Sequence, residues 1–165
     1  MLKIGLLSDT HGYCDKRFLL HFAACDEIWH AGDIGSQEII DNLRNIKTFR
    51  AVHGNADSQA IRREYPQHLR FRAEAVDVWM THIGGYPGKY APEVSPEIFI
   101  HPPKLFISGH SHILKVKYDK TLKLLHINPG AAGKQGWQQV RTLVRFIIDG
   151  ENIQDLEVIE LSEST

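Results

Sequence analysis

Five short apolar runs in this chain each end abruptly in a polar segment, and this pattern limits the available folds more than any other feature. The first run, Ile4–Leu7, breaks directly into Ser8, Asp9, Thr10, His11 and Gly12. A short apolar run that ends in glycine-marked turn chemistry is typical of a strand buried on both faces. The same change occurs at four later places: Gly32-Asp33, Gly54-Asn55, His82 before Gly84, and Gly109-His110 before His112. The pattern predicts the buried strands of an α/β protein.

The remaining periodicity places helices between the early strands and consecutive strands later. Apolar residues at near-helical spacing predict a helix from Lys16 to Ala24, and Ser36 fits the N-cap of a second helix. The segment Tyr86–Pro103 holds five of the seven prolines, so we expect a surface excursion there with one short helix near Pro96–Ile100. Further strands are predicted at Glu27–His30, Lys47–Val52, Leu69–Phe71, Val76–Met80, Leu105–Ile107, Ile113–Tyr118, Leu122–Ile127, Val140–Ile148 and Ile153–Leu161.

Length and composition predict a single domain over residues 1–165 and exclude some partners. The formal charge of -1, with both signs interspersed, provides no basic field for long nucleic acids. Two cysteines cannot form a disulfide framework, and no leader-like or bilayer-spanning stretch is seen, so we expect a cytoplasmic protein without a membrane partner. A homo-oligomer stays open, because an exposed edge strand can pair two copies.

The polar segments contain side chains that bind cations. The carboxyl ends of strands in α/β sheets line one crevice, so two carboxylates, one amide and four imidazoles can converge there. If the backbone stays extended after Leu7, Asp9 and His11 leave the chain on the same side. Asp33 and Asn55, taken alone, fit turn or cap residues equally well.

The size and chemistry of this set predict two metal ions. Seven ligands are too many for one four-coordinate ion but suit two ions that share a carboxylate. Nitrogen and oxygen ligands without thiolate favour manganese, with iron, nickel, cobalt or zinc as alternatives. The seven candidate ligands are Asp9, His11, Asp33, Asn55, His82, His110 and His112.

In their order, these residues resemble the five blocks of the calcineurin-like metallophosphoesterases. The Ser-Asp-Thr-His-Gly opening and Asn128-Pro129-Gly130 are most similar to the small YfcE-type phosphodiesterases. The resemblance implies a four-layer αββα sandwich of two mixed sheets flanked by helices. It also implies two divalent cations: one is held by Asp9, His11 and His112, the other by Asn55, His82 and His110, and Asp33 bridges them. The expected activity is phosphodiester hydrolysis by attack of a metal-bridging hydroxide on a small phosphate ester.

One departure from the family concerns the acid that protonates the leaving group. Larger members have a histidine at the position of Ala56, so the obvious acid is missing and Asp57 is the candidate in its place. Asn55 and Tyr86 are candidate substrate contacts, and Lys89 and Tyr90 belong to the same irregular segment. Two alternatives remain. The site could act as a phosphomonoesterase or nucleotide pyrophosphatase, or the chain could be a non-catalytic scaffold like the retromer subunit that shares this fold.

Overall fold

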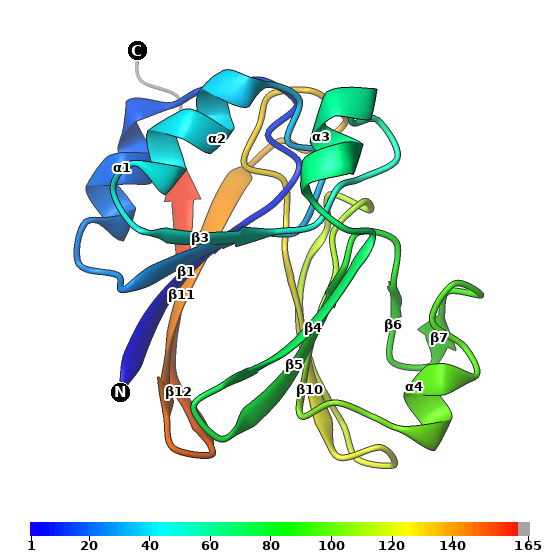
Figure 1. The fold of residues 1–165 in the computed structure, drawn as a ribbon. Helices are drawn as coiled ribbons and strands as arrows, with labels where there is room; N and C mark the ends of the chain where they lie inside the picture. Colours follow the sequence, from blue (N-terminus) through cyan, green and yellow to red (C-terminus); the bar gives the residue numbers. More distant parts are fainter. Residues whose placement is uncertain (162–165) are drawn as a thin grey trace.

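The computed structural model describes residues 1–161 and contains two five-stranded mixed sheets that face each other (Figure 1). The first sheet has three parallel strands that extend from its centre to one edge and an antiparallel pair at the other edge, in the order β12 (Asn152–Leu161), β11 (Arg141–Asp149), β1 (Leu2–Leu7), β2 (Glu27–His30) and β3 (Thr48–Ala51). The second has three parallel central strands, in the order β4 (His68–Ala73), β5 (Val76–Thr81), β8 (Leu105–Ile107), β10 (Leu124–Pro129) and β9 (Leu114–Asp119).

Helices cover the outer faces of the two sheets unequally. Three helices pack on the first sheet: α1 (Lys16–Phe22), α2 (Gln37–Arg44) and α3 (Gln59–Glu64). Within the described residues, the second sheet is covered only by the four-residue helix α4 (Glu97–Ile100) and the ribbon of β6 (Gly85–Tyr86) and β7 (Lys89–Tyr90) (Figure 1). The predicted αββα layers are therefore present, and the fourth layer is thin.

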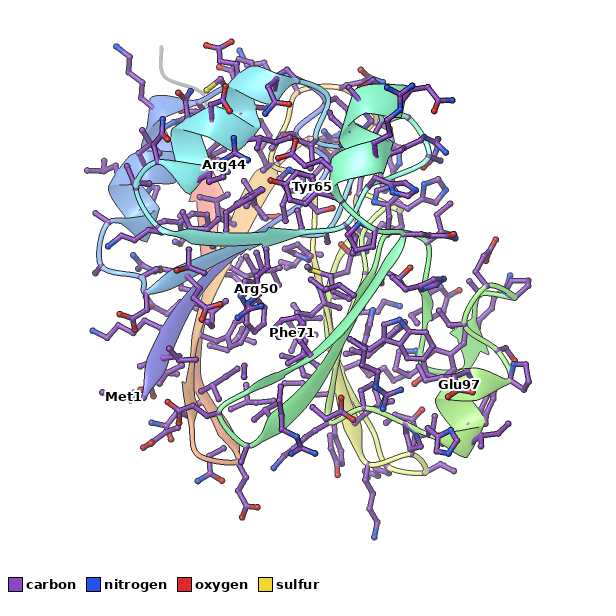
Figure 2. The ribbon with its side chains drawn as sticks, viewed as in Figure 1. Met1, Arg44, Arg50, Tyr65, Phe71 and Glu97 are labelled. Carbon is purple, nitrogen blue, oxygen red and sulfur yellow. The ribbon has the colours of Figure 1, made fainter. Side chains whose placement is uncertain are left out.

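Apolar side chains between the sheets fix how the sheets lie on each other. Trp29 of β2 meets the ring of Phe71 of β4 edge-on, with 5.0 Å between ring centroids. The Arg50 guanidinium of β3 lies 4.6 Å from the centre of the same Phe71 ring (Figure 2). These contacts place β2 and β3 over β4, and the cluster continues across the interior with Leu6, Met80, Ile107, Ile127 and Val144.

Most predicted elements are present, and the differences have local causes. The predicted Lys16–Ala24 helix ends at Phe22, where the Cys25 N–H turns back to the Phe22 carbonyl. The predicted Leu122–Ile127 strand begins at Leu124, because the Asp119 carboxylate accepts from the Leu122 N–H and holds that residue in the turn.

One helix and one two-stranded ribbon were not predicted. One is α3, whose signal was Ser58, since this hydroxyl caps the helix by accepting from the Ile61 N–H. The other is the short β6–β7 ribbon within the proline-rich segment. Along the described part of the chain, no helix has the length and apolar character needed to cross a membrane.

Candidate metal centre

The carboxyl ends of β1, β2, β3, β5 and β8 meet at one edge of the sandwich, and the predicted ligands lie there. Six of the seven form two groups, each with its ligand atoms within 4.8 Å of one another: Asp9, His11 and His112, and Asp33, His82 and His110. The seventh, Asn55, adjoins the second group, with its Oδ1 3.0 Å from Nδ1 of His110. Each group takes residues from both sheets, since β1 and β2 belong to the first and β5 and β8 to the second.

Asp9 has one fixed oxygen and one that faces the centre. Its Oδ2 accepts from the Ser8 hydroxyl at 2.7 Å and from the His110 backbone N–H at 3.1 Å. Its Oδ1 lies 3.2 to 3.7 Å from three imidazole nitrogens, the Nε2 atoms of His112, His11 and His82. The hydrogen bonds to Oδ2 thus orient the free oxygen toward the ligands of both groups.

Asp33 lies between the two groups. Its Oδ1 accepts from the Ala56 N–H at 2.9 Å. Its Oδ2 lies 3.1 Å from Nε2 of His82 in one group and 3.6 Å from Nε2 of His11 in the other. One carboxylate oxygen therefore lies close to an imidazole from each group.

Hydrogen bonds on the far side of two rings fix which nitrogen can bind a cation. The Nδ1–H of His82 donates to the Ala31 carbonyl at 2.8 Å, which leaves the lone pair on Nε2. Gln138 uses its amide N–H groups on the Gly133 and Gln135 carbonyls, so its Oε1 accepts from Nδ1–H of His112 at 2.8 Å. In its neutral form, each of these imidazoles therefore presents the lone pair of Nε2 to the centre.

Three buried polar atoms at the centre have no hydrogen-bond partner within the described residues: Oδ1 of Asp9 and the Nε2 atoms of His11 and His82. A buried polar atom without a partner costs about 1 to 3 kcal/mol, so such atoms are rare in folded proteins. Here all three converge on one place, and all are lone-pair donors of the type that divalent transition metals bind. The residues present therefore fit a metal centre.

The electrostatics of the centre keep both carboxylates ionised. Burial raises the pKa of Asp9, but the neighbouring imidazoles, above all those of His11 and His112, together outweigh burial and hold that pKa well below the usual range. Burial also raises the pKa of Asp33, but the neighbouring His82 imidazole and the hydrogen bond from the Ala56 N–H together outweigh burial and lower that pKa. Two negative charges thus remain in a largely buried site, where a cation would neutralise them.

The backbone at the ligands is not extended. The sequence had suggested an extended backbone for Asp9 and His11, and the structure differs. Asp9 has φ 56° and His11 φ 46°, both in the left-handed region. Of the eight non-glycine residues with positive φ in residues 1–161, five are candidate ligands: Asp9, His11, Asp33, His110 and His112. This conformation costs about 1 to 3 kcal/mol per residue and clusters at functional sites. The two side chains do converge, but through tight turns and not through strand alternation.

A glycine is required at position 54, where the loop after β3 passes close to Asp33. A Cβ added at Gly54 would overlap both Oδ1 and the backbone nitrogen of Asp33. The close approach of these two loops therefore excludes any side chain at this position.

Asp57, the predicted candidate acid, is engaged elsewhere. It is buried, and its oxygens accept from the Gly35 N–H at 2.9 Å and the Gly54 N–H at 2.8 Å. Both carboxylate oxygens are therefore engaged with the backbone of the loops that follow β2 and β3. This geometry favours a loop-positioning role for Asp57 over a role as proton donor.

Two residues that support the centre were missed. His30, which was predicted only as the end of a strand, accepts from the Gly32 N–H through Nδ1 and lies 2.9 Å from the Thr10 hydroxyl through Nε2, so it joins the loops after β1 and β2. Gln138 orients His112 but lies in a segment without recognisable pattern, so no sequence signal marks it. Tyr86, the candidate substrate contact, lines a pocket that borders His110 together with Lys89 and Tyr90.

Two facing mixed sheets whose strand ends join two carboxylates and four imidazoles define the class of the metallophosphoesterases. The chain belongs to the calcineurin-like phosphoesterase superfamily, whose family model matches residues 2–151.

Relatives and solved structures agree with this assignment. A protein of Methanothermobacter thermautotrophicus, described as a probable metallophosphoesterase, is 28% identical over 161 residues, covering 94% of this chain and 91% of the relative. The structure of an archaeal phosphodiesterase matches with a TM-score of 0.77 at 20% identity, over 97% of this chain and all of that one. Vps29 of Entamoeba histolytica in complex with zinc matches with a TM-score of 0.75 at 14% identity, over 97% and 98% of the two chains.

Proposed function

We propose that this protein is a phosphodiesterase that depends on two divalent metal ions and hydrolyses small phosphate esters. The observation that carries the proposal is the pair of ligand groups with Asp33 Oδ2 between them and three buried lone-pair atoms that lack partners. Both groups draw on nitrogen and oxygen ligands only, which favours manganese.

The ligands divide between the two ions as the groups suggest. Asp9, His11 and His112 would hold one ion, and Asn55, His82 and His110 the other, with Asp33 shared. When bound, a pair of divalent cations supplies an activated water and neutralises the phosphoryl oxygens.

The other residues of the chain orient these ligands and decide how the leaving group departs. The Ala31 carbonyl and the Gln138 side chain hold two imidazoles in the binding tautomer. The side chain of Ala56 has no acidic proton, and the oxygens of Asp57 accept backbone hydrogen bonds. We infer that the leaving group departs without a side-chain acid, which favours esters of acidic alcohols and phenols.

Two other functions use the same residues differently. Phosphomonoesterase or nucleotide pyrophosphatase activity would need the same metal ligands. Only a comparison of substrates therefore distinguishes these reactions from phosphodiester hydrolysis. A non-catalytic scaffold would bind metal without turnover, and the likeness to Vps29 concerns the fold alone.

The test is metal loading and turnover on the same preparation. Protein stripped with a chelator is titrated with Mn²⁺ and assayed on bis(p-nitrophenyl) phosphate and p-nitrophenyl phosphate. We expect two ions per chain and faster hydrolysis of the diester. Faster hydrolysis of the monoester would reassign the substrate, and full metal loading without turnover of either ester would support the scaffold.

The chain offers a closely matched pair of variants. Asp33→Asn removes the shared carboxylate at a left-handed position, φ 54°, and should abolish binding of the second ion. Asp155→Asn makes the same change at φ 53° on the exposed surface of β12 and should leave metal binding and turnover unchanged.

A further inference from the structure

A pocket of about 330 Å³ lies directly beside the metal centre. It is enclosed by the β6–β7 ribbon on one side and by the loop after β8 and the strands β9 and β10 on the other. His110, a candidate ligand of the second ion, forms part of its wall. A group bound in this pocket would therefore adjoin a phosphate held at the centre.

The wall of the pocket is apolar, and its charges are of one sign. Large apolar side chains include Ile83 and Ile113, and Ile113 is 46% exposed although it borders the cavity. Among the described residues, the charged groups of the wall are Lys89 and Lys115, and no carboxylate lines it. Ligand pockets of this size and character bind organic groups through apolar contact, with a few polar groups that set orientation.

Tyr86 offers a flat aromatic surface at this pocket. Its side chain is 39% exposed, and the ammonium of Lys115 lies 3.9 Å from the centre of its ring. The cation over the ring orients both side chains. An aromatic ring on the ligand could stack on Tyr86 or meet it edge to face, which adds to the free energy gained from burial alone.

The border between pocket and centre is polar. Ser111 follows His110, and its hydroxyl oxygen accepts from the Ile113 N–H and from the Asn128 amide, both at 3.1 Å. Both lone pairs are therefore used, and the hydroxyl proton remains to donate. A phosphate ester has the same division, with charged oxygens at one end and an organic group at the other.

We propose that this pocket binds the organic group of the ester, and that the group it selects is aromatic, such as an aryl ring or a nucleobase. The inference rests on the proposed function, because it assumes that a phosphoryl group occupies the adjoining metal centre. The volume fits one ring system with its substituents and not a polymer, consistent with a small substrate.

The test compares two phosphonates that differ only in the organic group. Phenylphosphonate and methylphosphonate are titrated into the Mn²⁺-loaded protein by isothermal calorimetry, so the readout does not depend on turnover. We expect phenylphosphonate to bind at least about tenfold more tightly, because a buried phenyl ring contributes that much through apolar area. Tyr86→Ala and Ile113→Ala should each reduce this preference by about threefold or more, and Tyr86→Phe should retain it.

Two matched controls remove side chains of similar exposure outside the pocket. Tyr118→Ala and Val116→Ala truncate residues of β9 that are 54% and 43% exposed, and both should keep the wild-type preference. Equal affinity for the two phosphonates, with esters still hydrolysed, would overturn the pocket assignment alone. Failure to bind either phosphonate, together with no turnover, would remove the proposed function and this inference with it.

Discussion

Buried His126 should make the folded protein less stable in mild acid. This residue of β10 is 1% exposed, and its Nε2–H donates to the Ser108 hydroxyl at 2.9 Å. That hydroxyl donates to the Gly85 carbonyl, so the unprotonated Nδ1 of His126 stays buried without a partner in the described chain. Burial, with a smaller contribution from the charge of Lys115, lowers the pKa of His126 from 6.5 to about 4.

The folded and unfolded states bind the His126 proton in different pH ranges, and this difference makes stability depend on pH. Between pH 6.5 and about 4 the unfolded chain protonates this imidazole and the folded chain does not, so acid favours unfolding. The contribution to stability is complete above pH 6.5 and is lost as the pH falls toward 4. A gap of about 2.5 pH units corresponds to about 3 kcal/mol in total, of which about 2 kcal/mol is lost by pH 5.

The assay is urea unfolding, followed by tryptophan fluorescence in the presence of a chelator, at pH 8 and pH 5. His126→Gln keeps a donor for Ser108 but cannot titrate, so its loss of stability between the two pH values should be about 2 kcal/mol smaller than that of the wild type. His30 and the imidazoles of the metal centre add the same pH dependence to the stability of both proteins, so their contributions cancel in this comparison. His101→Gln, which removes an exposed imidazole, is the control. If His126→Gln lost as much stability as the wild type, the reasoning would be refuted.

Four further predictions concern the centre. Asp9→Asn should lower turnover at least about 100-fold and reduce bound manganese, as measured by elemental analysis. Gly54→Ala should destabilise the protein by about 1 to 3 kcal/mol in urea, because its Cβ overlaps Asp33, and a wild-type midpoint would contradict this. Across aryl esters, rates should rise steeply with leaving-group acidity, since Ala56 donates no proton; a flat series would argue for an unrecognised acid. Manganese affinity should already fall as the pH drops toward 6.5, because the neighbouring Asp9 carboxylate raises the pKa of His112 above its usual 6.5 and protons then compete with the metal.

The sequence predicted the strands and their polar ends well because both signals are local. Leu105–Ile107 is an apolar run bounded by turn residues, and its limits match β8. The ligand positions follow from the same signal, since a polar residue directly after a buried strand must lie at the edge of the sheet. For this reason all seven predicted side chains lie together.

What the sequence did not reveal depends on contacts between distant segments. The left-handed conformation of Asp9 is set by hydrogen bonds across the fold, including its N–H to the Gly32 carbonyl. The role of Gln138 depends on the loop between β10 and β11 returning to His112, 26 residues earlier in the chain. Asp57 resembled a free acid because its two backbone donors, Gly35 and Gly54, come from separate loops.

The mixed origin of the two ligand groups links metal affinity to how the sandwich is assembled. Each proposed ion would be coordinated by loops from both sheets, so the ions would link the two sheets to each other. Sliding one layer over the other by a single residue would separate Asp9 from His112 and Asp33 from His82 without changing any strand internally. Metal occupancy would therefore report on how the two halves are docked, and a substitution deep in the interface, far from any ligand, could empty the centre.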